Sequence, residues 1–360
     1  MSVHAARAKF RLFSILLAVV VFAPGWAAAD DGHGSRRPLE RIVVFGDSLS
    51  DPGNAFALNG GQTVSAPDYG MTGLAANGVP EAVTLIPEAP YASRRFSNGP
   101  TWIELLAGAI GLGSSARPAV AGALFGTDDG RASNYAVGGS TAADLTASGA
   151  GQFHLAAQVN LFLSDVRGRA PGDALYVIAI GGNDVRAALE AGPGVLSLAL
   201  ASVGQNIQKL YGAGARKFLV WNAPDLGRTP ALQRLDAAIC PVRGCVSTGA
   251  TAASAGYNAG LGQVLQGLGA LPGIAIVAFD TFGSLAAVQE NPARFGLRDA
   301  ATACIQPNVP AFGFPSSPPF RCAQPDRHFF WDGIHPTRAG HAVIAFLVGR
   351  TLVAAVLQDD

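Results

Sequence analysis

The chain has 360 residues, of which 49% are hydrophobic and 14% are charged; this is enough apolar material for a sizeable core, and it excludes an intrinsically disordered protein. The formal net charge at pH 7 is zero, from 25 basic and 25 acidic residues, so the sequence lacks the charge excess of a nucleic-acid-binding protein. The basic residues are nearly all arginines scattered along the chain, which argues against a polybasic membrane patch.

The N-terminus carries the pattern of an export signal. Three basic residues precede an apolar run at 12–21, and small residues follow up to Ala29. This order is typical of a secretory signal peptide over residues 1–29, so we expect a secreted or periplasmic protein cleaved near Ala29. A membrane anchor is the alternative, but the run is short for a span and Pro24 follows closely. Residues 30–39 are expected to form a flexible leader.

Apolar strands alternate with helical segments along the rest of the chain. Strands are expected at 41–45, 133–137, 173–180, 216–221 and 274–279, and helices at 100–110, 195–211, 251–268 and 336–357. Continuous apolar strands between helices predict a parallel sheet covered on both faces. No linker or repeat divides the chain, so we expect one domain over 40–358. Residues 59–97, rich in Gly, Pro and Ala, are expected to form an inserted loop that rims the site.

Three of the expected strands end in polar or Gly-rich turns. These turns are Asp47-Ser48, Gly138-Gly139 and Gly182-Asn183. In parallel sheets of this kind the ligand crevice lies outside the carboxyl ends of the strands. The three turns are therefore expected to meet at one functional edge of the sheet.

The first turn presents Ser48 as a candidate nucleophile. A serine hydroxyl needs an adjacent base, and the base needs a third group to orient it. In the segment Asp332-Gly333-Ile334-His335 a carboxylate precedes a histidine by three residues, and a tight loop can return the carboxylate to the ring. We expect Ser48 to be the nucleophile, His335 the general base and then acid, and Asp332 the group that orients the imidazole.

Acyl transfer also needs hydrogen-bond donors for the oxyanion that develops on the carbonyl oxygen. The candidates are the backbone N–H of Ser48, the backbone N–H of Gly139 and the side-chain amide of Asn183. Glycine lets the backbone approach the substrate closely, and an asparagine amide is a neutral, directed donor. Asn183 could instead cap the helix that follows it.

These blocks, in this order, resemble the GDSL esterase/lipase family, also called SGNH hydrolases. The matching blocks are Gly46-Asp47-Ser48-Leu49-Ser50-Asp51 with Asn54, Asn134-Tyr135-Ala136-Val137-Gly138-Gly139, Gly181-Gly182-Asn183-Asp184 and Asp332-Gly333-Ile334-His335-Pro336-Thr337. Arg95-Phe96-Ser97-Asn98-Gly99 and Pro224-Asp225-Leu226-Gly227 resemble further segments of the lipase or lecithinase-like branch. Pro52 departs from the pattern, because relatives often carry another residue after the Asp. Many members of this branch carry a C-terminal outer-membrane barrel, which we do not expect here after Asp360.

The resemblance implies a flavodoxin-like three-layer α/β/α sandwich with a mostly parallel five-stranded sheet. It implies an exported serine esterase or lipase that forms an acyl-enzyme on Ser48, with the roles given above for Gly139, Asn183, Asp332 and His335. No cofactor and no metal are expected. The expected partner is a small-molecule or lipid ester, with transient contact with lipid surfaces, and the protein is expected to be a monomer.

Two other functions fit the same motifs. An acyltransferase or phospholipase would use the same residues, and only water exclusion at the site separates acyl transfer to an alcohol from hydrolysis. A non-catalytic binding protein that keeps the fold is the other alternative, and the intact Ser48, Asn183, Asp332 and His335 argue against it. An α/β-hydrolase is excluded, because the chain contains no Gly-x-Ser-x-Gly sequence.

Four cysteines fit an oxidising compartment. Three pairings are possible, and we favour Cys240–Cys245 and Cys304–Cys322, because each pair brackets a loop rich in Pro or Gly. A zinc site is the alternative, but these spacings match no common zinc motif. The segments at 304–322 and 59–97 are both expected to rim the site. Their content of Ala, Pro, Phe and Leu favours a substrate with an apolar acyl chain over one with a sugar.

Overall fold

The computed structural model describes residues 39–58, 63–64, 86–87, 94–120, 130–148, 152–242, 244–306 and 320–358. The expected signal peptide, nearly all of the leader and most of the loop at 59–97 lie outside these residues. The described part of the chain contains all of the blocks that the sequence singled out.

A parallel sheet forms the centre of the molecule. Its four strands are β1 (Arg41–Gly46), β4 (Ala174–Ala179), β5 (Lys217–Trp221) and β6 (Ala275–Phe279), in the spatial order β1-β4-β5-β6. Every pair in this sheet is parallel. All six residues of β4 are buried, as expected for a strand covered on both faces.

The expected fifth strand at 133–137 is only partly formed. This segment runs beside β1, where the Val44 N–H donates to Ser133 and the Tyr135 N–H donates to Val44, at 2.9 and 2.8 Å. It forms isolated parallel bridges, Val44 with Asn134 and Pro118 with Asn134, rather than a regular ladder. The Tyr135 and Val137 N–H groups donate to β1, so the Ala136 N–H faces away from β1, where the Asn134 side chain accepts it.

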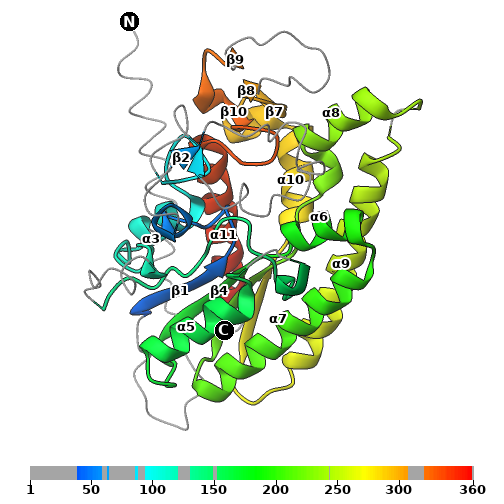
Figure 1. Ribbon diagram of the computed structural model, residues 1–360. Coiled ribbons are helices and arrows are strands. Elements are labelled where there is room, and N and C mark those ends of the chain that lie inside the picture. The colour runs from blue at the N-terminus through cyan, green and yellow to red at the C-terminus, as the bar shows by residue number, and fades with distance from the viewer. Residues whose placement is uncertain are drawn as a thin grey trace, which may run out of the picture.

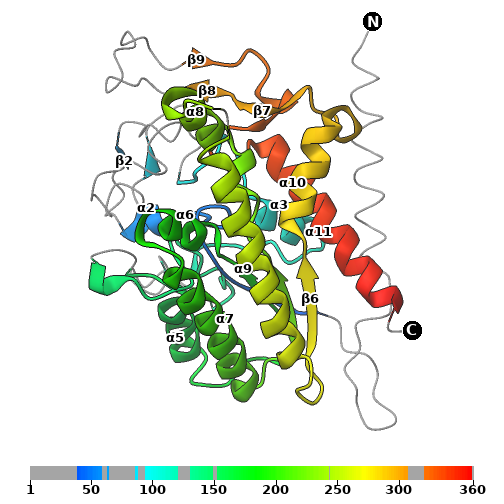
Figure 2. The ribbon, with the colours of Figure 1, turned by 90° about the vertical axis from the view of Figure 1, so that its right-hand side faces the viewer.

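Helices cover both faces of the sheet, which gives the three layers that the family resemblance implies (Figures 1 and 2). Val43 and Phe45 face one layer, while Ile42 and Val44 face the other. The first layer consists of α5 (Leu155–Asp165), α7 (Gly194–Ala213) and α9 (Ser247–Leu268), and the second consists of α3 (Trp102–Ala109), α10 (Thr281–Glu290) and α11 (Arg338–Gln358). The alternation of side chains along each strand therefore divides the core into two halves.

The four expected helices are present as α3, α7, α9 and α11, with ends that differ by at most four residues from the predicted ones. The sequence patterns did not predict α5, α10, α2 (Asn54–Leu58), α6 (Gly182–Ala191) or α8 (Pro230–Ile239). By length and composition, α11 could cross a membrane. It contributes Val343, Ile344 and Val348 to the buried core, so it packs against the sheet as expected.

Short elements lie beyond the carboxyl edge of the sheet. The small sheets are β7 (Asp299–Ala303) with β10 (His328–Phe330), β8 (Ile305–Gln306) with β9 (Phe320–Arg321), and β2 (Thr63–Val64) with β3 (Ile86–Pro87). Single 3-10 turns lie at η2 (Thr146–Ser148), η3 (Leu226–Arg228), η4 (Pro292–Phe295) and η6 (Pro325–Arg327). The predicted disulfides are confirmed: Cys240 pairs with Cys245 between α8 and α9, and Cys304 pairs with Cys322 beside β8 and β9.

Candidate active site

Ser48 lies in a tight turn directly after β1, at the carboxyl edge of the sheet. The Asp47 carboxylate accepts the N–H of Leu49 at 3.0 Å, and the Asp47 carbonyl accepts the N–H of Ser50 at 3.0 Å. An aspartate that bonds to the backbone two residues further on stabilises such a turn. Ser48 is only half-buried, so its hydroxyl can be reached from the site.

Gln158 and strand β4 both contact Gly46 at the end of β1. Gln158 of α5 accepts the Gly46 N–H and donates to the Gly46 carbonyl, both at 2.9 Å. A Cβ atom on Gly46 would lie 2.8 Å from the carbonyl oxygen of Ala179 in β4. Glycine is therefore required at this position, because β4 passes too close for a side chain.

His335 bridges Ser48 and Asp332. Its Nε2 lies 2.9 Å from the Ser48 Oγ, and its Nδ1 lies 2.8 Å from the Asp332 Oδ2. The other carboxylate oxygen of Asp332 accepts the N–H groups of Ile334 and His335, at 2.9 and 2.7 Å. A carboxylate beside Nδ1 favours the tautomer that carries the proton there, which leaves Nε2 free to accept the serine proton. Asp332 and His335 are both almost fully buried, so little water competes for these bonds.

Phe96 packs against the imidazole, and sequence reasoning did not assign it a role. Its ring stacks on His335 with centroids 5.3 Å apart and planes 28° apart. Ser97 donates to the carbonyl oxygen of Pro336 at 2.8 Å, so the same segment also holds the backbone after the histidine. The Arg95-Phe96-Ser97-Asn98-Gly99 block was the available signal, but the sequence does not reveal what it contacts.

Gly138 also lies against the ring of Phe96. A Cβ atom on Gly138 would be 2.2 Å from Cε2 of the ring. The ring is thus in contact with both the histidine and the loop at 138–143. Glycine at 138 is required by this close approach rather than by its backbone angles, since only Gly139 has a positive φ, of 80°.

The structure distinguishes between the two glycines of this loop. The Gly138 N–H donates to Asp51 at 2.8 Å, and the Ser140 N–H donates to the Val137 carbonyl at 3.2 Å. Within the described residues, the Gly139 N–H donates to no protein group. Of the two, Gly139 therefore has the N–H that a substrate oxygen could use.

The first turn of α6 contacts the same loop. The Asn183 side chain donates to the Ser140 carbonyl at 2.9 Å, which uses one of the two hydrogens of its amide. The next residue, Asp184, accepts the N–H groups of Ala142 and Ala143, both at 2.8 Å. The strand ends at Ser48 and Asn183 and the loop carrying Gly139 are therefore held at one edge of the sheet.

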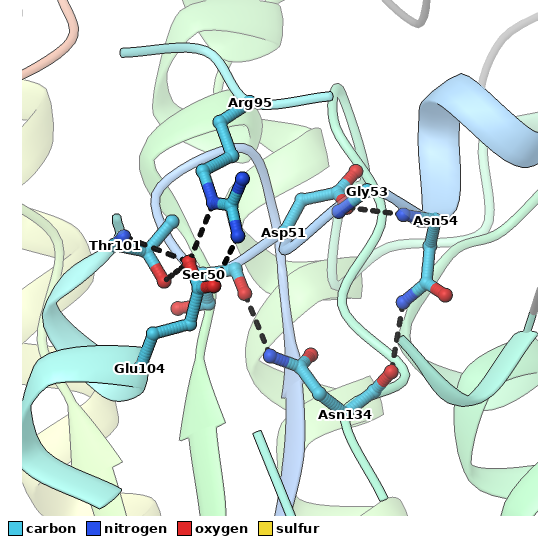
Figure 3. A network of polar contacts seen from close by, with 8 residues as sticks. All are labelled: Ser50, Asp51, Gly53, Asn54, Arg95, Thr101, Glu104 and Asn134. Carbon is cyan, nitrogen blue, oxygen red and sulfur yellow. Dashed lines mark hydrogen bonds and ion pairs between the residues drawn. The ribbon is translucent and has the colours of Figure 1, made fainter. Parts of the chain in front are cut away.

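A network of amides joins the turn at 47–51, which carries Ser48, to the segment at 133–137 (Figure 3). Asn134 donates to the Ser50 carbonyl at 2.8 Å, and Asn54 donates to the Asn134 carbonyl at 2.7 Å. Asn54 also donates to the Ala136 carbonyl at 2.9 Å. Asn134 and Asn54 thus fix the turn after Ser48 against the segment at 133–137.

The start of α3 supports the site from the other layer. Arg95 pairs with Glu104, which also accepts the N–H of Thr101 at 2.9 Å (Figure 3). The Trp102 N–H donates to Nδ1 of His341 at 3.2 Å. His341 is thus a buried packing residue between α3 and α11.

Burial shifts the pKa values of several groups here. Burial raises the pKa of Asp47 and of Asp51 to about 6 and that of Asp184 to about 7, although each carboxylate accepts backbone hydrogen bonds that oppose the shift. Burial, followed by the nearby charge of His335, lowers the pKa of His341 to about 3. His341 is therefore neutral at physiological pH.

A largely apolar cavity of about 100 Å³ opens beside Ser48. Its walls come from the ends of β1, β5 and β6 and from α6, α10 and α11, and they include Trp221, Phe279, Phe330 and Leu347. Ser48, Asn183 and His335 lie on the same cavity. Its lining suits a hydrocarbon group held next to the serine.

One group of potential metal ligands occurs among the described residues. It comprises Asp236, Cys240 and Cys245. The two cysteines form a disulfide, so neither offers a thiolate, and the group lacks the donors of a zinc site.

Comparison with known proteins finds one family that covers most of the chain. The model of the GDSL-like lipase/acylhydrolase family matches residues 42–348. Similar proteins include the GDSL esterase/lipase At5g03820 of Arabidopsis thaliana, 26% identical over 338 residues that cover 87% of this chain and 91% of the relative. Two others from the same plant, At1g73610 and At5g55050, are each 28% identical and cover 92% and 98% of this chain and 95% and 93% of their own lengths.

Proposed function

Because the chain belongs to the GDSL-like lipase/acylhydrolase family, we propose that its carboxylic ester hydrolase activity uses Ser48 as the nucleophile. The relatives are named esterase/lipases, and the enzyme is a serine hydrolase of the SGNH type. The observation that carries the assignment is the hydrogen-bonded chain from Ser48 through His335 to Asp332, with contacts of 2.9 and 2.8 Å.

In the first half-reaction the Ser48 Oγ attacks the carbonyl carbon of the ester. The hydroxyl proton passes to Nε2 of His335, and the carbonyl π electrons move onto oxygen to give a tetrahedral oxyanion. The resulting imidazolium is stabilised by the Asp332 carboxylate, which remains ionised. The oxyanion then reforms the carbonyl, the C–O bond to the alcohol breaks, and His335 gives its proton to the leaving alkoxide. The products of this step are the alcohol and an acyl-enzyme.

In the second half-reaction water takes the place of the alcohol. His335 accepts a proton from the water as its oxygen attacks the acyl carbon, and a second tetrahedral oxyanion forms. Its collapse breaks the bond to Ser48, which regains the proton from His335, and the carboxylic acid leaves. No step needs a metal or a cofactor.

The oxyanion is stabilised by three N–H groups in this proposal. The backbone N–H of Gly139 is supported by having no protein acceptor among the described residues. Asn183 keeps one amide hydrogen beyond the one it donates to Ser140. The backbone N–H of Ser48 is the third donor. Donors fixed before the reaction lower the barrier because they need no reorganisation as charge develops.

The apolar cavity supports an ester with a hydrocarbon acyl group as the substrate. Aromatic and aliphatic side chains line the space next to Ser48. An acetylated sugar would place hydroxyl groups against these walls and lose their hydrogen bonds to water. We therefore expect activity to rise from acetyl esters to esters of longer acyl chains.

We propose export because residues 1–29 have the pattern of a secretory signal peptide. The two disulfides fit an oxidising compartment. We expect residues 1–29 to be removed and the mature domain over 40–358 to act as a monomer outside the cytoplasm. The N-terminal sequence and the mass of the protein recovered from the periplasm and the medium test this, and a retained N-terminus would contradict it.

The test of the mechanism is a chain-length series of aryl esters with the mature protein and Ser48→Ala. Hydrolysis is expected in the wild type and only background hydrolysis in the variant, since the nucleophile is absent. Ser114→Ala is the matched control, because Ser114 is an exposed loop serine away from the site. A fluorophosphonate probe should add to Ser48, as peptide mass mapping would reveal. Full activity in Ser48→Ala would refute the mechanism.

A further inference from the structure

Two buried aspartates hold the loop at 138–143 on either side of Gly139. On one side, Asp51 accepts the N–H of Gly138 at 2.8 Å. On the other, Asp184 accepts the N–H groups of Ala142 and Ala143 at 2.8 Å each. Neither aspartate is exposed to solvent, and the two residues are 133 positions apart in the sequence (184 minus 51).

Each aspartate belongs to an element that also carries a residue of the proposed site. Asp51 lies three residues after Ser48, and its other oxygen accepts the N–H groups of Gly53 and Asn54 at 2.7 and 2.6 Å (Figure 3). Asp184 follows Asn183 in the first turn of α6. The loop is therefore fixed directly to the nucleophile turn and to the helix that carries the amide donor.

The contacts require carboxylates rather than other polar groups. At Asp184 each carboxylate oxygen accepts one of the two N–H groups, and at Asp51 both oxygens accept N–H groups, so neither residue has an oxygen that a donor could replace. An asparagine would turn its NH₂ group toward one of these N–H donors and leave that donor unsatisfied. Within the described residues neither Asp51 nor Asp184 forms an ion pair, so backbone N–H groups are the main partners of both buried carboxyl groups. Such an arrangement is costly for stability and points to a role in the site.

Gly139 lies at the apex of the loop between these two attachments. Its φ of 80° is in the left-handed region, and its N–H donates to no described protein group. We propose that Asp51 and Asp184 are positioning residues that fix the Gly139 N–H in the oxyanion hole. This inference rests on the proposed function, because it assigns to both carboxylates a part in stabilising the oxyanion formed at Ser48.

The test compares Asp184→Asn with the wild type on an aryl ester. We expect kcat to fall by roughly 10- to 100-fold with KM little changed, since a donor displaced by a fraction of an ångström is weakened mainly in the transition state. An alkyl boronic acid should lose affinity by a similar factor, because its tetrahedral adduct with Ser48 places an oxygen in the hole. A purely structural role would lower stability without this matched loss.

Asp236→Asn is the matched control. Asp236 is also buried, and it also accepts two successive N–H groups, those of Val246 and Ser247, at 2.8 and 3.0 Å. It joins α8 to α9 and does not contact the loop at 138–143, so the control should lose stability and keep kcat and boronate affinity. Complete labelling with a fluorophosphonate titrates the reactive Ser48 in each preparation. The kcat of each variant is then calculated per folded enzyme molecule.

Asp51→Asn is the second variant, for use if Asp184→Asn does not fold. Wild-type kcat and boronate affinity in a folded Asp184→Asn or Asp51→Asn protein would overturn the inference. Equal losses in Asp236→Asn would also overturn it, because they would show a general effect of destabilisation. Failure of the proposed function is a different result: the wild type itself would then hydrolyse no ester, or Ser48→Ala would hydrolyse it equally well.

Discussion

A single methyl group added at Gly138 should disturb His335, the proposed general base. In Gly138→Ala the new Cβ would lie 2.2 Å from Cε2 and 2.4 Å from Cζ of Phe96. Ordinary van der Waals contact begins at 3.4 Å, so the ring must recede by about 1.2 Å (3.4 minus 2.2). The Phe96 ring stacks on His335, and it is fully buried, so it cannot recede without moving its neighbours.

This displacement of the Phe96 ring should lower both the stability and the rate of hydrolysis. Overpacking a buried site typically costs about 1–3 kcal/mol of stability. A displacement of about 1 Å near the reacting groups can cost roughly 100-fold in rate. We therefore expect Gly138→Ala to fold with reduced stability and to lose between roughly 10- and 100-fold in kcat. Urea unfolding and aryl ester hydrolysis measure the two effects separately.

The double variant with Phe96→Leu isolates the clash. Leucine lacks the ring atoms Cε2 and Cζ, so the methyl group at 138 should cost at least about 1 kcal/mol less in the Phe96→Leu background, which is a coupling typical of residues in contact. Gly256→Ala is the control: a Cβ at this helix position meets nothing within 4 Å, and alanine should be neutral or stabilising there. If Gly138→Ala keeps wild-type rate and stability, or if Phe96→Leu does not lessen its cost, the reasoning about this contact is wrong.

Three further predictions concern other parts of the molecule. Asn183→Ala should lower kcat roughly 100-fold while stability changes little, because an oxyanion donor is lost; ester hydrolysis and thermal unfolding measure this. His341→Gln should flatten the loss of stability at acid pH, as urea unfolding between pH 4 and 7 would show. Its folded pKa of about 3 is below the usual 6.5, so the unfolded state binds the proton more tightly, and stability is lost as pH falls from about 6.5 toward 3. Replacing Cys304 and Cys322 together by serine should lower the free energy of unfolding by about 3 kcal/mol, since the bridge closes a loop with a sequence separation of 18.

Each of these predictions has a result that would contradict it. Loss of stability in Asn183→Ala with turnover kept would limit Asn183 to holding the Ser140 carbonyl. If His341→Gln loses as much stability at acid pH as the wild type does, then groups other than His341 cause that loss. Equal stability of the Cys304→Ser, Cys322→Ser protein and the wild type, with and without reductant, would show that the bridge contributes nothing.

Local sequence patterns predicted the features that depend on near neighbours. The apolar run before Asp47 predicts a buried strand, and the polar turns predict a site at the carboxyl edge, because parallel strands all end on the same side. Four helices were predicted at 100–110, 195–211, 251–268 and 336–357 and are present. The cysteine pairs were predicted because each brackets a loop rich in Pro or Gly, and both are confirmed. The family resemblance connected Ser48 with His335, which are 287 residues apart.

Other features were missed because local patterns were weak. Helix α6 starts at Gly182 and is short, so the Gly-rich turn dominated its pattern. The expected fifth strand at 133–137 is apolar enough to be a strand, but it pairs with β1 only through an isolated bridge, and its asparagine bonds to the turn after Ser48.

The amino-acid sequence alone predicts the chemistry proposed for this protein: a serine, a histidine and an aspartate with amide donors, at the ends of parallel strands. The three-dimensional fold was needed to show which groups hold that chemistry in place. The bond from Gly138 to Asp51 joins residues 87 apart, and those from Ala142 and Ala143 to Asp184 join residues 42 and 41 apart. Hydrogen bonds and ring contacts depend on distances of a few ångströms between segments, and no local pattern of residues contains that information.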